Sequence, residues 1–277
     1  MKKLIKNIIK DILPPFFYRT ILDFTAQLTF SGSYSSWQEA QALSKGYNDS
    51  AIIDKVLTAA LSVKNGKAAY ERDSVLFNKI EYSWPLLTGL MLAASYRKKD
   101  FSVLDFGGAF GSSYFQNKKF IDAIGNVKWH IVEQTEFVRR GKENMENEYL
   151  LFHESIVSAL ASAGCFDAAL LSSVLQYLET PYETLEQIIS MDLPYIIIDR
   201  TPLYKGLNDR LTVQKVHPSI YDASYPAWIL SENKMLKCIS DQYNIISQFV
   251  SLGGNIRLVK PDGMATYTGF ILKRKKN

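Results

Sequence analysis

Residues 101–113 read FSVLDFGGAFGSS, and the rest of the chain is organised around them. A short apolar run ends in an acidic residue, and a glycine-rich turn and small polar residues follow it. Glycine lets a backbone approach a ligand closely, because it carries no Cβ and reaches left-handed φ angles without strain. A helix opened by the polar residues would offer unpaired N–H groups and a partial positive charge. The stretch therefore predicts a nucleotide-type pocket at the end of the first strand of a doubly wound sheet.

Strand and helix signals alternate from residue 101 to the end of the chain. Helical segments such as Glu136–Met145 and Pro181–Met191 separate apolar runs, which is typical of a parallel sheet with helices on both faces. Two β-rich segments, 243–250 and 265–273, finish the chain. We therefore predict an α/β fold with a seven-stranded, mostly parallel, doubly wound sheet of Rossmann-like type. Its first five strands are expected at 101–106, 128–133, 148–153, 166–172 and 194–199.

The chain before this core carries mainly helical signals. We expect residues 1–97 to form a helical N-terminal extension or cap, and residues 98–277 to form the Rossmann-like domain. Helices are predicted at 51–61 and 85–98, and residues 30–50 indicate an ordered loop with a short helix. A polar and aromatic segment joins the two helices. It lies where a substrate cover could sit, and solvation of a helix face explains its charges equally well.

The first 13 residues form an amphipathic pattern at helical spacing. Apolar residues share one stripe, lysines lie elsewhere, and Pro14 and Pro15 end the predicted helix. The helix could lie on an anionic membrane surface or a partner, or it could pack on its own domain. The apolar stretches are too short for a signal peptide or a membrane span.

The formal net charge of +4 is concentrated at the two ends of the chain. Four lysines lie within residues 1–10 and four basic residues within 273–276, so the remaining body is negatively charged. A nucleic-acid footprint across the fold is therefore not expected. Cys165 and Cys238 match no metal or redox spacing, and a reducing cytoplasm is the simplest location.

Acidic residues narrow the choice of ligand. Glu133 ends the predicted second strand, 22 residues after Gly111, where a doubly wound fold places a carboxylate on the ribose hydroxyls. With Gly107 and Gly108 the glycines run G-G-x-x-G, whereas dinucleotide folds usually show G-x-G-x-x-G. Asp105, two residues before the first glycine, would repel a pyrophosphate and suits a cationic group. S-adenosylmethionine carries a sulfonium, an ammonium and no phosphate, so this cofactor is favoured over NAD.

Several segments carry a resemblance to known proteins. VLDFGGAFGSS, HIVEQ, FDAALLSSVLQYLETP and YIIIDR resemble successive motifs of class I, seven-stranded S-adenosylmethionine-dependent methyltransferases. FSGSYSSWQEA, RDSVLFNKIEYSWPLL and QKVHPSIYDASYPAWILS resemble a less characterised methyltransferase-like family. Members of that family are often encoded among bacterial surface-polysaccharide genes. The resemblance covers most of the chain and implies S-adenosylmethionine as the cofactor.

The resemblance also assigns roles to individual residues. It implies that Asp105 lies near the methionine moiety, that Gly107 and Gly111 allow the cofactor to approach, and that Glu133 holds the ribose. A polar side chain after the third strand usually meets the adenine, and here Glu154 or Ser155 has that position. The fourth motif often has an asparagine at the strand end. Ser172 and Ser173 stand there instead, so Ser172 is the residue expected beside the cofactor.

Methyl transfer to a hydroxyl is an in-line displacement that usually needs a base for the acceptor's proton. His217 and Asp199 are the two candidates for this base. His217 could instead be a loop histidine bonded to backbone, and Asp199 could merely pair with Arg200. His130, inside an apolar strand, and His153, at a strand end, are expected to be structural or close to the adenine.

Residues 200–229 are too many for an ordinary connection, and we expect them to form a lid or binding loop. Arg200 could hold a phosphate or carboxylate, while Tyr221, Tyr225 and Trp228 could stack on a sugar ring. These aromatic residues could equally pack the loop onto the first third of the chain. The sequence shows no metal-binding triad.

These observations predict a cytoplasmic S-adenosylmethionine-dependent methyltransferase that O-methylates a sugar or glycan intermediate, and that is peripheral to the inner membrane if residues 1–13 bind lipid. Three alternatives stay open. The chain could be a NAD-type oxidoreductase, a non-catalytic cofactor-binding or membrane-associated scaffold, or a methyltransferase acting on a protein or small molecule.

Overall fold

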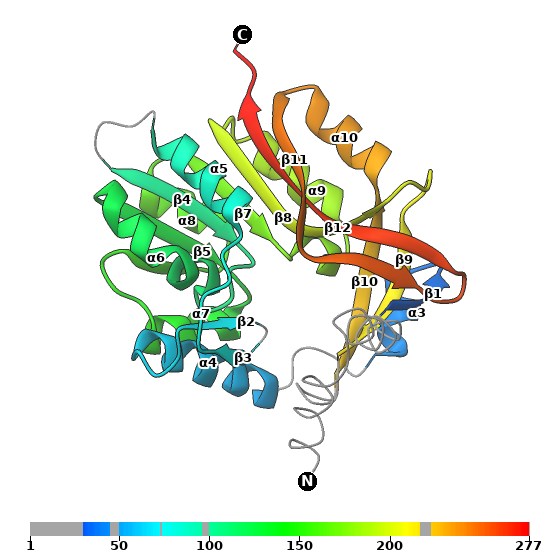
Figure 1. The fold of residues 1–277 in the computed structure, drawn as a ribbon, viewed down its shortest axis with the longest axis horizontal. Helices are drawn as coiled ribbons and strands as arrows, with labels where there is room; N and C mark the ends of the chain where they lie inside the picture. Colours follow the sequence, from blue (N-terminus) through cyan, green and yellow to red (C-terminus); the bar gives the residue numbers. More distant parts are fainter. Residues whose placement is uncertain (1–29, 45–49, 73, 96–99, 217–222, 277) are drawn as a thin grey trace, which may run out of the picture.

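The computed structural model describes residues 30–44, 50–72, 74–95, 100–216 and 223–276 (Figure 1). The helix expected at residues 1–13 lies outside these ranges, and so do His217 and Tyr221. The predictions made for them therefore remain predictions.

Five parallel strands form the centre of the sheet, in the spatial order β6-β5-β4-β7-β8 (Figure 1). In chain order this is third, second, first, fourth, fifth, the order of a doubly wound fold, and its switch point lies between β4 and β7. Each strand begins within two residues of its predicted start. The bounds are β4 Phe101–Phe106, β5 Val127–Val132, β6 Leu150–His153, β7 Ala168–Ser172 and β8 Tyr195–Tyr204.

A long hairpin completes the predicted set of seven strands. β12 (Gly263–Arg274) runs antiparallel to β8, and β11 (Tyr243–Leu258) pairs antiparallel with β12. Both strands are longer than the segments predicted from sequence. The mixed α/β, mostly parallel doubly wound fold is thus confirmed.

Three further strands enlarge the sheet to ten, and they correct the prediction of a loop at residues 200–229. β8 continues to Tyr204, and the chain returns as β9 (Arg210–Lys215) and β10 (Ser224–Ser231). β10 pairs with the end of β8, β9 pairs with β10, and β1 (Phe30–Tyr34) pairs with β9.

β9 was not predicted from the sequence because it contains polar residues that are buried in the fold. Arg210 donates to the backbone carbonyls of Gly32, Val259 and Pro261 at 3.0, 3.0 and 2.7 Å. Thr212 donates its hydroxyl proton to the carbonyl of Ala227 at 2.6 Å. Both side chains are buried. Because these partners come from distant parts of the chain, the local pattern gives no sign that the polar groups are satisfied.

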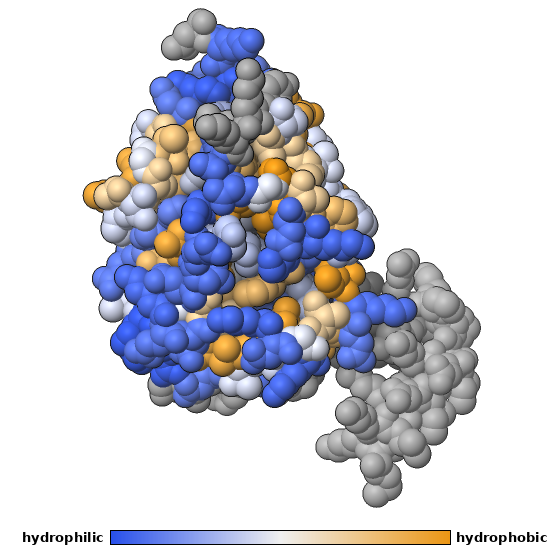
Figure 2. All heavy atoms as spheres, turned by 90° about the vertical axis from the view of Figure 1, so that its left-hand side faces the viewer, coloured by the Kyte–Doolittle hydropathy of each residue, from blue (hydrophilic) through white to orange (hydrophobic). Residues whose placement is uncertain are grey.

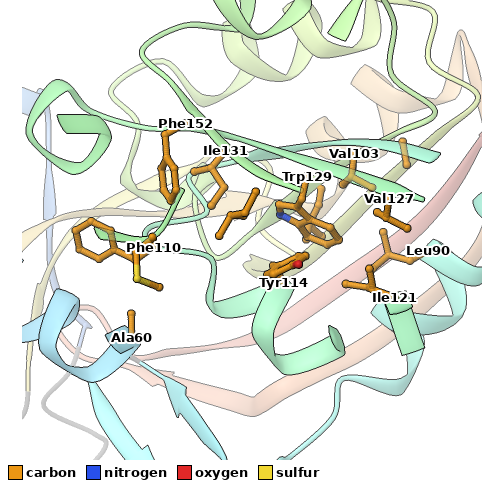
Figure 3. Packing of buried hydrophobic residues seen from close by; sticks show 14 of the residues in the cluster. Ala60, Leu90, Val103, Phe110, Tyr114, Ile121, Val127, Trp129, Ile131 and Phe152 are labelled. Atoms are coloured by element: carbon orange, nitrogen blue, oxygen red, sulfur yellow. The ribbon is translucent and has the colours of Figure 1, made fainter. Parts of the chain in front are cut away.

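Helices cover both faces of the sheet (Figure 1). One buried cluster joins the strands to four helices on the first face, and a second cluster joins the strands to three helices on the other face. In the first layer Trp129 of β5 lies beside Tyr114, with ring centroids 5.8 Å apart (Figure 3). The helices of the first face are α4 Ser50–Lys64, α5 Trp84–Ala94, α6 Ser112–Ile124 and α7 Thr135–Asn144; those of the second are α8 Ile156–Ala163, α9 Pro181–Ile189 and α10 Glu232–Ser240.

The part of the chain before residue 98 packs into the same core. It also contains α3 (Trp37–Ala42) and a hairpin of β2 (Tyr70–Arg72) and β3 (Val75–Phe77). α5 lies tightly on the sheet, since a Cβ at Gly89 would be 2.7 Å from a side-chain carbon of Ile197. The domain boundary at residues 97 and 98 remains a prediction.

The surface seen from the left of Figure 1 is largely hydrophilic, with hydrophobic residues in small groups (Figure 2). Within the described ranges, none of the helices combines the length and apolar character that crossing a membrane requires.

Candidate functional site

A cavity of about 680 Å³ lies at the carboxyl ends of the five parallel strands. This is the size of a small-molecule site, and the switch point is where ligands bind in open α/β sheets. Residues that follow β4, β5, β6 and β7 line it, together with Arg200 of β8. Elements outside the central strands, among them α3, β2 and the start of β10, add to the wall.

Most of the described residues predicted from sequence reach this cavity. Gly111, Asp199 and Trp228 do not line it. Gly111 supports the turn instead: it begins α6 with a φ of +92°, and its N–H donates to the carbonyl of Gly108 at 2.9 Å. The predicted residues that line the cavity are Asp105, Gly107, Gly108, Glu133, Glu154, Ser155, Ser172, Arg200 and Tyr225.

The turn after β4 requires glycine for steric reasons. Gly107 has a φ of +75°, and a Cβ there would lie 2.4 Å from Cγ2 of Val174. A Cβ at Gly108 would lie 2.5 Å from Oδ2 of Asp105. The turn therefore packs its backbone against the segment that follows β7 on one side and against a carboxyl group on the other.

Asp105 is a fully buried acid under this turn. Its Oδ2 accepts a hydrogen bond from the indole N–H of Trp129 at 2.8 Å, and no described residue hydrogen-bonds to its Oδ1. Burial raises the pKa of Asp105 to about 7; the Trp129 hydrogen bond and the charge of Arg200 lower it, and Glu133 raises it. At neutral pH the carboxyl group is thus poised between its two forms, and a nearby cation would stabilise the carboxylate.

Glu133 follows β5 and spans the base of the turn. Its Oε1 accepts from the N–H of Ala109 at 3.2 Å, and its Oε2 accepts from the N–H of Gln134 at 2.9 Å. Burial raises the pKa of Glu133, and these two backbone hydrogen bonds oppose the rise. The two bonds fix the carboxylate at the cavity wall, where its remaining lone pairs can accept from a ligand.

Glu154 and Ser155 lie at the exposed rim beyond β6. The hydroxyl of Ser155 caps α8 by accepting from the N–H of Ser158 at 3.1 Å. The next two residues add apolar surface to the cavity: Ile156 is buried, whereas Val157 is 71% exposed.

Two histidines pack behind this rim, outside the cavity lining. The rings of His130 and His153 are stacked with centroids 5.1 Å apart, and Nδ1 of His130 lies 3.0 Å from Nε2 of His153. Burial lowers the pKa of His130 to about 4, and burial also lowers the pKa of His153. Two neutral imidazole rings fit this geometry if one donates its ring N–H to the unprotonated nitrogen of the other.

Polar groups at the end of β7 and in the middle of β8 are coupled. The guanidinium of Arg200 donates to the hydroxyl oxygen of Ser172, with Nη2 at 3.2 Å and Nε at 3.4 Å. Ser172 in turn donates to Oδ2 of Asp199 at 3.5 Å. Asp199 is buried and does not line the cavity, but its Oδ2 lies close to two residues that do, the hydroxyl of Ser172 and, at 3.9 Å, Nε of Arg200.

Strained backbone accompanies these groups. Ala109, Ser173 and Arg200 have φ angles of +47°, +59° and +52°, in the left-handed region that residues with a Cβ rarely adopt. All three follow or lie near the carboxyl ends of central strands, and all three line the cavity. Strain of this kind gathers at functional sites.

Aromatic residues form the wall on the β10 side. The rings of Tyr177 and Tyr225 are perpendicular with centroids 5.2 Å apart, and both line the cavity. Trp228 faces away from it: its indole N–H donates to the carbonyl of Leu178 at 3.0 Å, and its ring stacks on Trp37 at 6.4 Å. Trp228 therefore supports Trp37, which does line the cavity.

Glu71 of β2 is a wall residue that sequence analysis missed. It is buried, and its Oε1 accepts a hydrogen bond from the hydroxyl of Ser112 in the first turn of α6. Its Oε2 accepts from the N–H of Ser74 at 3.2 Å. Only the packing of the β2–β3 hairpin over α6 brings Glu71 to the cavity, and no local sequence signal indicates that packing.

Within the described ranges, no group of three or more histidine, cysteine, aspartate or glutamate residues is arranged to hold a metal ion.

No family model and no curated protein matches the chain. Solved structures match it at low identity. The N-terminal domain of EvdMO1 with SAH bound gives a TM-score of 0.47 and 11% identity, over 80% of this chain and 97% of that one. The glycopeptide N-methyltransferase MtfA, complexed with S-adenosylmethionine, gives 0.44 and 11%, over 68% and 92%. The N-methyltransferase NodS from Bradyrhizobium japonicum, in complex with S-adenosylhomocysteine, gives 0.43 and 10%, over 79% and 99%. Similarity this distant assigns no function, which must be argued from the site itself.

Proposed function

We propose that the chain is a methyltransferase that uses S-adenosylmethionine. The observation that carries this proposal is Asp105, a buried carboxyl group beneath the glycine turn with one oxygen that no described residue binds. A phosphate placed there would meet a like charge in a medium of low dielectric constant, whereas an ammonium or sulfonium would restore the ionised carboxylate. The cofactor offers both of these cations.

The cavity suits an extended adenosyl ligand. In our proposal Glu133 accepts hydrogen bonds from the ribose hydroxyls, because its two backbone contacts hold it at the end of β5. The adenine lies against the rim formed by Glu154, Ser155 and Val157. The amino-acid end then lies toward Asp105 and the glycine turn.

The proposed acceptor is a hydroxyl group of a sugar or glycan intermediate. The bound cofactor would supply an electrophilic methyl group on a sulfonium. Tyr177 and Tyr225 would present ring faces to a sugar, and Arg200 would orient a polar or anionic substituent. The resemblance of the flanking segments to a family encoded with surface-polysaccharide genes supports the same acceptor class. In this proposal the protein acts in the cytoplasm, near the inner membrane if residues 1–13 bind lipid.

The acceptor's proton needs a route to a base. Asp199 could receive it through the hydroxyl of Ser172, which lines the cavity. Arg200 would stabilise negative charge on Ser172 during that transfer, since it donates two hydrogen bonds to the hydroxyl oxygen. His217, the other predicted base, lies outside the described residues.

Two alanine substitutions test the placement of the cofactor. Gly108→Ala pushes a methyl group into the carboxyl group of Asp105, whereas Gly263→Ala on β12 meets Leu258 at an ordinary 3.5 Å. We expect wild type and Gly263→Ala to bind S-adenosylhomocysteine in calorimetry, and Gly108→Ala to lose at least about tenfold in affinity. None of the three should bind NAD. Equal affinities in the two variants would place the cofactor elsewhere, and NAD binding with no binding of either sulfur ligand would favour an oxidoreductase.

A further inference from the structure

Glu71 places a negative charge at the N-terminus of a helix that faces the cavity. α6 is 13 residues long and begins at Ser112, whose hydroxyl donates to Oε1 of Glu71. Both residues line the cavity, together with Ser113. Glu71 is only 3% exposed and is held on its other side by the N–H of Ser74. Its position is therefore fixed by the fold.

The N-terminus of such a helix is the usual binding site of a phosphate group. Its unpaired N–H groups and its partial positive charge attract anions, and dinucleotide-binding folds place a pyrophosphate there. In this protein a carboxylate of the chain itself accepts from the hydroxyl of Ser112, the first residue of that helix. A second anion entering the cavity would have to displace Glu71 or approach it closely.

Two other acids reinforce this arrangement. Asp105 lies under the same turn, and no described residue hydrogen-bonds to its Oδ1. Glu133, which follows β5, accepts a hydrogen bond from the N–H of Ala109 in the turn. The acids come from three separate elements, so their convergence is a property of the fold. Two cations line the cavity as well, Arg72 next to Glu71 on β2 and Arg200 within β8. The three acids nevertheless converge around the glycine turn and the start of α6, where an anionic group of a ligand would meet them.

We propose that Glu71 is a specificity-determining residue, which excludes phosphate-bearing nucleotides from the N-terminus of α6 and favours a ligand with a cationic amino-acid end. This inference rests on the proposed function for the identity of the favoured ligand. The exclusion of phosphate stands on the position of Glu71 alone. Rejection by like charge is a recognised way to discriminate between ligands that share a nucleoside.

A merely structural role would be that Glu71 caps α6. Capping would affect stability but would not distinguish one ligand from another. Glu71→Gln separates the two roles, because the amide oxygen can still accept from Ser112 while the charge is lost. The NH₂ group cannot accept from the N–H of Ser74, so some stability is lost as well. Glu143→Gln is a matched control: it removes one negative charge from α7, where Glu143 pairs with Arg139 at 2.7 Å and neither residue lines the cavity.

The experiment measures the dissociation constants of three ligands by calorimetry. S-adenosylhomocysteine carries the amino-acid end, methylthioadenosine lacks it, and ADP carries a pyrophosphate. For Glu71→Gln we expect about tenfold weaker binding of S-adenosylhomocysteine, a change below about twofold for methylthioadenosine, and at least about fivefold tighter binding of ADP. Glu143→Gln should match wild type with all three ligands.

The inference would be overturned if the ratios of the three dissociation constants were the same in Glu71→Gln as in wild type, whatever the change in stability. Failure of wild type to bind S-adenosylhomocysteine would refute the proposed function and the choice of favoured ligand, while the ADP measurement would still decide whether Glu71 excludes phosphate. If Glu71→Gln does not fold, a series of ligands measured on wild type alone still tests the exclusion of phosphate. In wild type the affinity should fall from adenosine to AMP to ADP, and a rise along that series would contradict the exclusion of phosphate.

Discussion

Replacing Asp105 by asparagine should stabilise the folded chain at alkaline pH while it removes the charge proposed to hold the cofactor. The side chain is fully buried, with Oδ2 bonded to Trp129. Asparagine can keep that bond through its amide oxygen and place its NH₂ group where Oδ1 now lies. The substitution therefore resembles permanent protonation of the carboxyl group.

The magnitude follows from the pKa of Asp105, which burial raises from 3.8 to about 7. Because the folded-state pKa lies above the unfolded one, the folded state holds its proton more tightly. The contribution of Asp105 to stability is highest below about pH 4 and falls as the pH rises toward 7. The loss reaches about 4 kcal/mol above pH 7 and is about 2 kcal/mol at pH 5. Asp105→Asn removes this loss, so its advantage over wild type should grow with pH.

Urea unfolding of both proteins at several pH values between 4 and 8 measures the effect. Asp122→Asn is the control, since Asp122 forms an exposed pair with Lys118 on α6 and its loss should change stability by less than about 1 kcal/mol. A difference between Asp105→Asn and wild type that does not change with pH would refute the reasoning. The same result would also remove the argument that a cationic ligand group stabilises the carboxylate of Asp105.

Three further predictions concern other parts of the molecule. The pKa of His130 is lowered to about 4 in the fold, so the contribution of this residue to stability should fall by up to about 3 kcal/mol between pH 6.5 and pH 4. In urea unfolding, the stability of wild type relative to His130→Gln should fall as the pH is lowered, and parallel curves would contradict this. Arg210→Met should lower the free energy of unfolding by about 3–5 kcal/mol, because three backbone carbonyls lose their donor. The control Arg257→Met removes an exposed ion pair with Asp262, 3.8 Å long, and should lower it by less than about 1 kcal/mol. Deleting residues 1–13 should abolish sedimentation with anionic vesicles if the segment binds membranes, and unchanged sedimentation would dismiss that role.

Sequence patterns predicted the central sheet because its strands are buried on both faces and read as apolar runs. They also predicted the ligand site, since the glycine turn after Phe106 and the acid at Glu133 follow consecutive strands and must meet at one edge of the sheet. These features depend on local periodicity and on the topology of doubly wound folds.

Features that depend on distant partners could not be predicted. β9 and β10 were interpreted as a loop because Arg210 and Thr212 are polar, and their hydrogen-bond partners come from other segments. Glu71 reaches the cavity only because a short hairpin packs over α6. Conversely, Trp228 was expected to bind substrate, yet its indole N–H is engaged by Leu178 behind the wall.

Calorimetric titration of wild type with S-adenosylhomocysteine at pH 7, in two buffers of different ionisation enthalpy, tests the central claim most directly. The ligand's ammonium should convert Asp105 fully to the carboxylate, and since its pKa is about 7, binding should release about half a proton. Asp105→Asn should release none. Absence of binding to wild type, or binding without proton release, would contradict the account.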